Sequence, residues 1–170
     1  MCLSCFKDAI LTILILFFFT LCSCNHGLQP TEENISMMSG ISGTIYYVNW
    51  PSEESIYDLR LVVFNRYPPG DIFDELGKNR AHVYPAIGQA GLPFPVDSTT
   101  YIMELDSGYY EYVVLAQQYG SNVFQDWLAA GQYDTLFTDE IPTPIQVRSG
   151  EILEHVDIHV DFDNLPPQPF

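Results

Sequence analysis

The run from Tyr109 to Gln117 is apolar at both odd and even positions and follows a tight turn at Asp106-Ser107-Gly108. A strand that faces water on one side alternates polar and apolar residues, whereas a strand covered on both faces does not. The run therefore predicts a strand in the centre of a sheet. A chain that contains it has to build a sheet around it.

Six further runs are short, rich in Tyr, Val and Ile, and bounded by Gly, Pro, Asp or Ser, as strands are. They cover residues 43–50, 57–65, 81–84, 99–105, 144–148 and 151–162. Two other segments have helical spacing and predict one or two helical turns each. About seven strands at this spacing predict an all-β fold, an antiparallel β-sandwich with short helical insertions near 71–76 and 123–130. The last two runs are expected to meet in a hairpin turn at Ser149-Gly150.

The segment Leu105-Asp-Ser-Gly-Tyr-Tyr-Glu-Tyr-Val-Val-Leu-Ala116 resembles the L-x-x-G-x-Y-x-(apolar)-x-(apolar) signature of carboxypeptidase regulatory-like, or transthyretin-like, sandwich domains. In that family the Gly turns the chain and the Tyr opens a core strand. Gly108 and Tyr110 take these places here, and Tyr112, Val114 and Ala116 are expected to continue the inward-facing side.

The opening Ser42–Ile45 and the closing Val147–Glu151 hairpin are similar to the first strand and last strand pair of this family. The sequence departs from the family at Ser98-Thr-Thr100, where a Gly usually precedes the Tyr-rich strand. The resemblance implies a transthyretin/prealbumin-like topology and a non-catalytic accessory module without a cofactor.

The apolar block from Ala9 to Leu21 is 13 residues long, whereas a membrane-spanning helix needs about 20. Its length is that of a signal-peptide core. The sequence that follows, Leu21-Cys22-Ser23-Cys24, resembles the lipobox of bacterial lipoproteins. The resemblance implies cleavage before Cys24 and attachment of a lipid to its thiol. We therefore expect a membrane-anchored protein of the bacterial cell envelope, at the outer membrane or cell surface.

This processing would remove three of the four cysteines and block the fourth, so the mature chain has no disulfide. The expected organisation is a lipoprotein signal peptide over 1–23, a flexible tether over 24–39, a β-sandwich domain over 40–163 and a Pro-rich tail over 164–170. The folded domain must be stabilised by its hydrophobic core alone, and a chain of this size is long enough to bury one.

The formal net charge of −16 stays the same after removal of the signal, because Lys7 and Asp8 are lost together. A surface this acidic repels phosphate backbones, which excludes nucleic acid as a partner. The expected partners are the membrane, through the lipid anchor, and an envelope protein or a glycan.

The usual catalytic patterns do not occur in the sequence. It has no G-x-S-x-G elbow, no H-E-x-x-H, no glycine-rich phosphate loop and no C-x-x-C after Cys24. We therefore predict a non-catalytic protein with a structural or accessory role in an envelope complex, and a hydrolytic enzyme is a remote alternative.

A glycan- or peptide-binding module is the main alternative function. Long loops on a rigid sandwich are common recognition sites, and aromatic side chains supply rigid contact area. The 120–141 loop and its flank carry Tyr119, Tyr133 and Phe137, which are the candidate ligand contacts. Trp127 is expected to close this segment against a sheet.

A polar stripe near the C-terminal end alternates with apolar residues, as on a strand with one wet face. It consists of His155, Asp157, His159, Asp161 and Asp163. His155 and His159 would lie about 13 Å apart on a strand, which is too far for one ion. We predict a solvated outer face and no metal site.

Overall fold

The structure of this protein is a computed structural model that describes residues 38–136 and 141–169. Ser36–Phe170 form one compact unit, which contains its own hydrophobic core. The described residues are mostly β, with one short α-helix. In chain order the elements are β1 (Gly40–Val48), the 3-10 turn η1 (Glu53–Ser55), β2 (Asp58–Phe64), α2 (Ile72–Gly77), β3 (Ala81–Tyr84), β4 (Ser98–Glu104), β5 (Gly108–Tyr110), β6 (Tyr112–Gln118), β7 (Trp127–Gln132), β8 (Ile145–Val147), β9 (Ile152–Leu153) and β10 (Ile158–Asp161).

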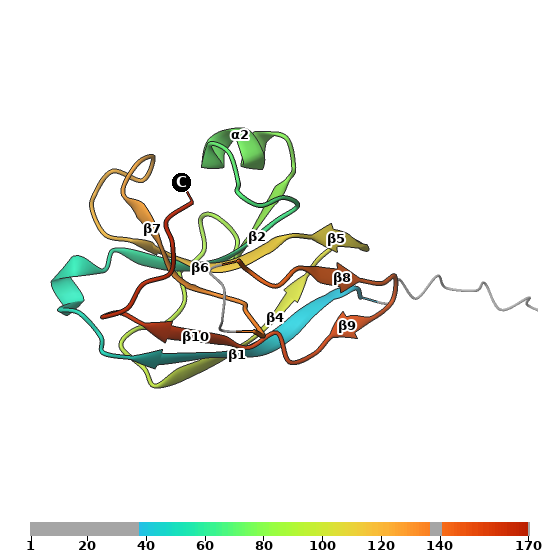
Figure 1. The fold of residues 1–170 in the computed structure, drawn as a ribbon. Helices are drawn as coiled ribbons and strands as arrows, with labels where there is room; N and C mark the ends of the chain where they lie inside the picture. Colours follow the sequence, from blue (N-terminus) through green and yellow to red (C-terminus); the bar gives the residue numbers. More distant parts are fainter. Residues whose placement is uncertain (1–37, 137–140, 170) are drawn as a thin grey trace, which may run out of the picture. The chain divides into compact units, whose positions relative to one another are not determined.

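The strands form two larger sheets and one small one. Sheet A has the order β10-β1-β4, with β9 also paired to β1, and sheet B has the order β3-β2-β6-β7. β5 and β8 form the third, two-stranded sheet. Figure 1 shows sheets A and B facing one another, with α2 on the opposite side of sheet B from sheet A.

Sheet A is mixed, so the prediction of a purely antiparallel arrangement is wrong. β1 pairs antiparallel with β4 but parallel with both β9 and β10. The chain reaches β9 and β10 only after it has completed sheet B, and so no hairpin turn fixes their direction relative to β1.

The inner core fills the space between sheets A and B. β2 contributes Leu59, Leu61 and Val63, which are fully buried, and β6 contributes Val113 and Leu115. Apolar residues of β1, β4 and β10 face them from sheet A. Each such side chain contributes about 1.5–3 kcal/mol when fully buried. The described residues contain no cysteine, so this core is what stabilises the two sheets against each other.

The opposite face of sheet B is also apolar, which explains why the run that begins at Tyr109 does not alternate. Its buried members are Val62, Phe64, Ala81, Tyr112, Val114, Ala116 and Ala129. The prediction of a central strand is confirmed, because β6 lies between β2 and β7.

The predicted inward side of Tyr112, Val114 and Ala116 is wrong. Tyr110 belongs to the inner core, whereas Tyr112 belongs to the outer cluster. The chain changes sides at Glu111, where it leaves the β5–β8 pair and joins β2 through a hydrogen bond from the Glu111 amide to the Phe64 carbonyl (3.0 Å).

One of the two predicted helical insertions is confirmed. α2 begins after Asp71, whose side chain accepts a hydrogen bond from the Asp74 amide (3.0 Å) as an N-cap. The segment 123–130 is not helical. A single turn at 122–126 leads into β7, because backbone pairing with β6 outweighs the helical spacing of its apolar residues.

The turns at Gly108 and Gly150 differ in backbone conformation. Positive φ occurs at Gly150 (75°) but not at Gly108, among the glycines that the structure describes. The turn before β5 is instead held by the Tyr110 hydroxyl, which donates to the Asp106 carbonyl (2.9 Å). The turn at Gly150 does not close a hairpin, because β8 pairs with β5 and β9 pairs with β1.

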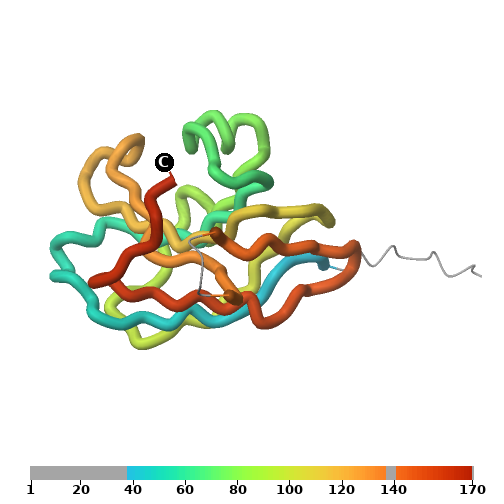
Figure 2. Tube along the Cα trace, viewed as in Figure 1, coloured from blue at the N-terminus to red at the C-terminus, as the bar shows by residue number. Residues whose placement is uncertain are grey.

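The segment 164–169 runs back past β7 (Figures 1 and 2). Gln168 accepts a hydrogen bond from the Ala129 amide (2.8 Å) and donates one to the Ala129 carbonyl (3.0 Å). One side chain thus pairs with the edge of sheet B as a neighbouring strand would. Among the described residues, no helix is long and apolar enough to cross a membrane.

Candidate functional site

An open groove lies on the outer face of sheet B. Its floor consists of Val62 and Phe64 on β2 and Ala116 on β6, and its volume is about 390 Å³. α2 and the β6–β7 connection rise from the same side of the sheet and form the walls (Figure 2). Binding sites for small molecules occupy about 300–1,000 Å³ and are mostly apolar, and the groove falls within this range of size and lining.

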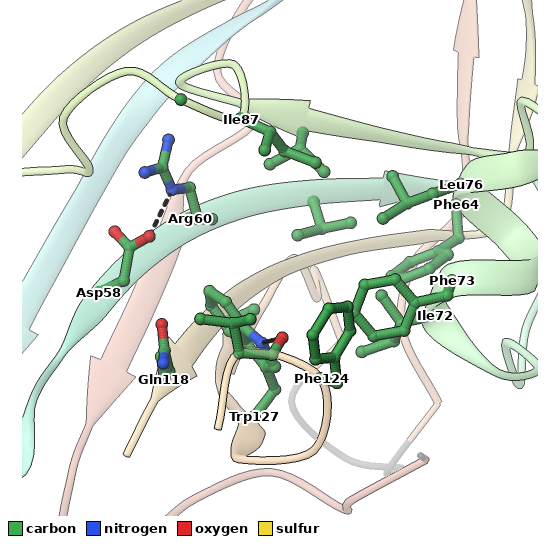
Figure 3. A pocket seen from close by; sticks show the side chains of 15 residues that line it. Asp58, Arg60, Phe64, Ile72, Phe73, Leu76, Ile87, Gln118, Phe124 and Trp127 are labelled. Atoms are coloured by element: carbon green, nitrogen blue, oxygen red, sulfur yellow. Dashed lines mark hydrogen bonds and ion pairs between the residues drawn. The ribbon is translucent and has the colours of Figure 1, made fainter. Parts of the chain in front are cut away.

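Aromatic and aliphatic side chains form the walls of the groove. α2 supplies Phe73, the β6–β7 connection supplies Phe124, and the start of β7 supplies Trp127 (Figure 3). The Phe73 and Phe124 rings are in contact, with their centroids 4.9 Å apart. These rings nevertheless remain 40% and 67% exposed. Covering them would remove a contiguous apolar surface from water, which favours binding of an apolar partner.

A cluster of ion pairs around the buried Glu75 holds α2 over the sheet. Glu75 is fully buried, and its carboxylate accepts hydrogen bonds from Arg80 (2.7 and 3.0 Å), Arg66 and the Gly70 amide (3.3 Å). The Arg80 hydrogen bond lowers the pKa of Glu75 to about 2, with Arg66 and the Gly70 amide acting in the same direction against the effect of burial. A helix of six residues is not stable alone. Its position therefore depends on Glu75.

Side-chain hydrogen bonds fix the opposite wall. The Asn122 side chain accepts from the Phe124 amide (3.0 Å), and Asp126 accepts from the Asn122 amide (2.8 Å). The Trp127 indole donates to the Val123 carbonyl (2.8 Å). The connection is thus an ordered turn that presents Phe124 toward α2.

One end of the groove is polar. Along β2 the residues on the outer face are Asp58, Arg60, Val62 and Phe64, in that order. Asp58 lies opposite Gln118 of β6, and Phe64 lies opposite Tyr112. The floor therefore changes from charged to apolar along the strand, and Figure 3 shows Asp58, Arg60 and Gln118 together at one end.

Two of the predicted ligand contacts, Tyr119 and Tyr133, do not line this groove. Tyr119 is 47% exposed just beyond β6, and Tyr133 is half-buried against the inner core after β7. Phe137 lies outside the described residues, as does Cys24. The ligand contacts of Tyr119, Tyr133 and Phe137 and the lipidation of Cys24 remain predictions.

Phe124 and Trp127, which line the groove, belong to the same 120–141 segment as the predicted contacts Tyr133 and Phe137. Trp127 packs against the outer cluster of sheet B, as expected, although from a strand. Phe73 and Phe124 could have been recognised as apolar residues in short polar insertions. The contact between the two rings could not have been predicted, because it joins two connections that are distant in the sequence.

The polar stripe does not form one continuous strand face. The extended segment is interrupted between β9 and β10, where His155 adopts a φ of 63°. Asp157 accepts a hydrogen bond from the Thr44 amide (2.7 Å), and Asp161 accepts one from Asn49 (2.8 Å). The His159 ring stacks on Tyr46, with the centroids 5.0 Å apart. Asp163 is exposed.

The alternation itself is confirmed for Val156, Ile158 and Val160, which are buried in the inner core. Within residues 38–136 and 141–169, no three His, Cys, Asp or Glu side chains gather closely enough to hold a metal ion.

No family model, curated protein or solved structure matches this chain. Function is therefore inferred from the chemistry of the groove.

Proposed function

We propose that this protein is a lipid-anchored, non-catalytic accessory module of the cell envelope, which binds an apolar peptide segment of a partner protein. The observation that carries the proposal is the groove on sheet B, with an apolar floor and three aromatic side chains in its walls. Aromatic anchors in a preformed groove are the common basis of peptide recognition.

A peptide fits the lining better than a glycan does. A sugar ring carries several hydroxyl groups, and each loses free energy on burial unless it finds a hydrogen-bond partner. The polar side chains at the groove are Asp58, Arg60 and Gln118, and they lie at one end. The aromatic walls therefore offer stacking without the hydrogen bonds that a sugar requires.

The lining also supports a binding role over catalysis. None of the described residues that line the groove is a Ser, Thr, Cys, His or Lys. The one carboxylate, Asp58, is hydrogen-bonded to Arg60 (2.8 Å). The groove thus lacks a nucleophile with an adjacent base.

The finer fold assignment is part of the proposal. We propose a carboxypeptidase regulatory-like, transthyretin-like sandwich. The facing of sheets A and B across one core and the Gly108–Tyr110 turn support it. β1 pairs in parallel with β9 and β10, which a purely antiparallel sandwich does not have. In the proposed assignment, these two pairs are a variation on the topology of the family.

Selection from a library of displayed random peptides tests the binding role. The target is residues 36–170, because this unit supplies its own core. We expect enrichment of peptides with clustered apolar residues. Their affinity should fall at least about tenfold in Phe124→Ser, a variant that removes an exposed ring without opening the core.

Ala116→Leu, which fills the floor, should have the same effect as Phe124→Ser. Ile102→Ser is the matched control, because Ile102 is also an exposed apolar residue (56%) but lies on β4 of sheet A. Failure to enrich any peptide would contradict the proposal, and so would groove variants that both bind the enriched peptides as tightly as the unmutated protein does.

The anchor is tested separately by labelling cells with a clickable fatty acid. The protein should be labelled and membrane-bound, and Cys24→Ala should lose the label. A labelled Cys24→Ala variant would contradict the anchor without affecting the groove.

A further inference from the structure

The polar end of the groove carries a charge pattern that selects among ligands. Asp58 accepts hydrogen bonds from its neighbours at two positions, the Leu59 amide (2.9 Å) and the Arg60 Nε (2.8 Å). A carboxylate has about four acceptor positions. The Asp58 side chain is 22% exposed, so it can accept further hydrogen bonds from a bound group.

Arg60 has little capacity left for an anion. Besides Asp58, its guanidinium donates from Nη1 to the carbonyls of Pro85 (2.8 Å) and Ala86 (3.1 Å), and from Nη2 to the Gln89 carbonyl (2.7 Å). Four of its five N–H groups are therefore used within the protein. Its side chain is only 10% exposed, and it braces the 85–89 loop against β2.

The remaining lining reinforces this asymmetry. Gln118 lies opposite Asp58 and donates its side-chain amide to the Gly120 carbonyl (2.7 Å). Trp127 pairs with Gln118 on the other side of β6 and also lines the groove, and an aromatic face attracts cations. The protein as a whole carries a net charge of −16, which disfavours anionic ligands further.

We infer that the Asp58 end of the groove binds a cationic group of the partner peptide, namely a Lys or Arg side chain beside the apolar residues that occupy the rest of the groove. This inference rests on the proposed peptide binding. The acceptor is Asp58 Oδ1 or Oδ2, and the aliphatic stem of the basic residue lies over Ala116, which pairs with Arg60 two residues along β2 from Asp58.

Three simple probes separate the charge preference from apolar binding: n-octylammonium, n-octanol and n-octanoate. They share an alkyl chain and differ in the charge of the head group at pH 7. Each is titrated into ¹⁵N-labelled residues 36–170 and followed by amide chemical shifts. We expect all three to shift Val62 and Ala116, and octylammonium to bind roughly fivefold or more tightly than octanoate.

The variants locate the preference. Asp58→Asn should abolish the preference for octylammonium. The affinity for octanoate should then approach that for octylammonium, while the affinity for octanol stays unchanged. Asp97→Asn removes the same charge from an exposed position outside the groove and should keep the preference. In the unmutated protein, nuclear Overhauser contacts should place the methylene next to the nitrogen beside Asp58 and Gln118, which tests the inference even if Asp58→Asn does not fold.

Each other result contradicts one specific claim. If no probe shifts Val62 or Ala116, the groove does not bind apolar chains and the proposed function fails. If octanoate binds as tightly as octylammonium in the groove, the charge inference fails and the groove remains. An equal loss of preference in Asp97→Asn would assign it to the general acidity of the surface, which would also overturn the inference.

Discussion

Glu75 is the residue that positions one wall of the groove. The Arg80 hydrogen bond, supported by Arg66 and the Gly70 amide, lowers its pKa to about 2 from a usual 4.5. A carboxyl whose pKa is lower in the folded state stabilises the fold above its unfolded pKa and loses this effect as the pH falls through the folded value. Its contribution should therefore disappear between about pH 4.5 and pH 2.

The corresponding prediction concerns Glu75→Gln. Urea unfolding should show a lower midpoint than the unmutated protein at pH 7, and the two midpoints should converge as the pH approaches 2. Glu104→Gln, at an exposed strand position, is the control for loss of one negative charge. A difference between Glu75→Gln and the unmutated protein that is constant over this range would show that the carboxylate charge does not hold α2.

Two glycines give opposite predictions. A Cβ on Gly43 would collide with the carbonyl oxygen of Val156, whereas a Cβ on Gly108 would meet the Tyr110 ring at 3.6 Å, an ordinary contact. Gly43→Ala should therefore destabilise the fold by about 1–3 kcal/mol. Gly108→Ala should change it by less than about 0.5 kcal/mol. Chemical unfolding measures both, and a larger effect at Gly108 would contradict the packing of β1 described above.

At the scale of elements, the sequence predicts strands well wherever local pattern decides them. β1 to β4 fall within or close to the predicted runs, and α2 matches its predicted segment. β7 was missed because Phe124, Trp127 and Leu128 have helical spacing, and only pairing with β6 makes this segment extended. The parallel partners of β1 could not be predicted, since they depend on contacts more than a hundred residues apart.

The groove shows the same limit. The outer-face order Asp58, Arg60, Val62, Phe64 is readable once β2 is known, because alternate residues share a face. The contact between α2 and the 122–126 turn cannot be read from the sequence, because hydrogen bonds of the folded state set the positions of both segments. The sequence therefore predicts an aromatic segment over 120–141, but not which of its residues face the groove.

The edge of sheet B provides a prediction at this scale. Gln168 occupies both hydrogen-bonding groups of Ala129, which an edge strand would otherwise leave open. Gln168→Ala should destabilise the fold by about 0.5–1.5 kcal/mol per hydrogen bond lost. Hydrogen exchange at the Ala129 amide should accelerate, while Asn164→Ala serves as a control in the same segment. Unchanged exchange at Ala129 would show that the 164–169 segment does not protect this edge.

At the scale of the whole molecule, one acidic domain combines a predicted membrane anchor with a groove that is neutral and apolar over most of its length. A net charge of −16 keeps such a surface soluble and disfavours association between copies. The same charge attracts partners that carry basic residues, and attraction of this kind weakens as salt screens it. Under the proposed function, charge and groove together would recruit an apolar, basic segment to the membrane.

The measurement that tests the groove most directly is an amide chemical-shift map of ¹⁵N-labelled residues 36–170, titrated with a peptide enriched from the random library. The largest changes should fall on Val62, Ala116 and Trp127, which line the groove on three strands of sheet B. If the largest changes fall instead on Tyr133 and the segment after it, or on β4, with Val62 and Ala116 unmoved, the outer face of sheet B is not the binding site.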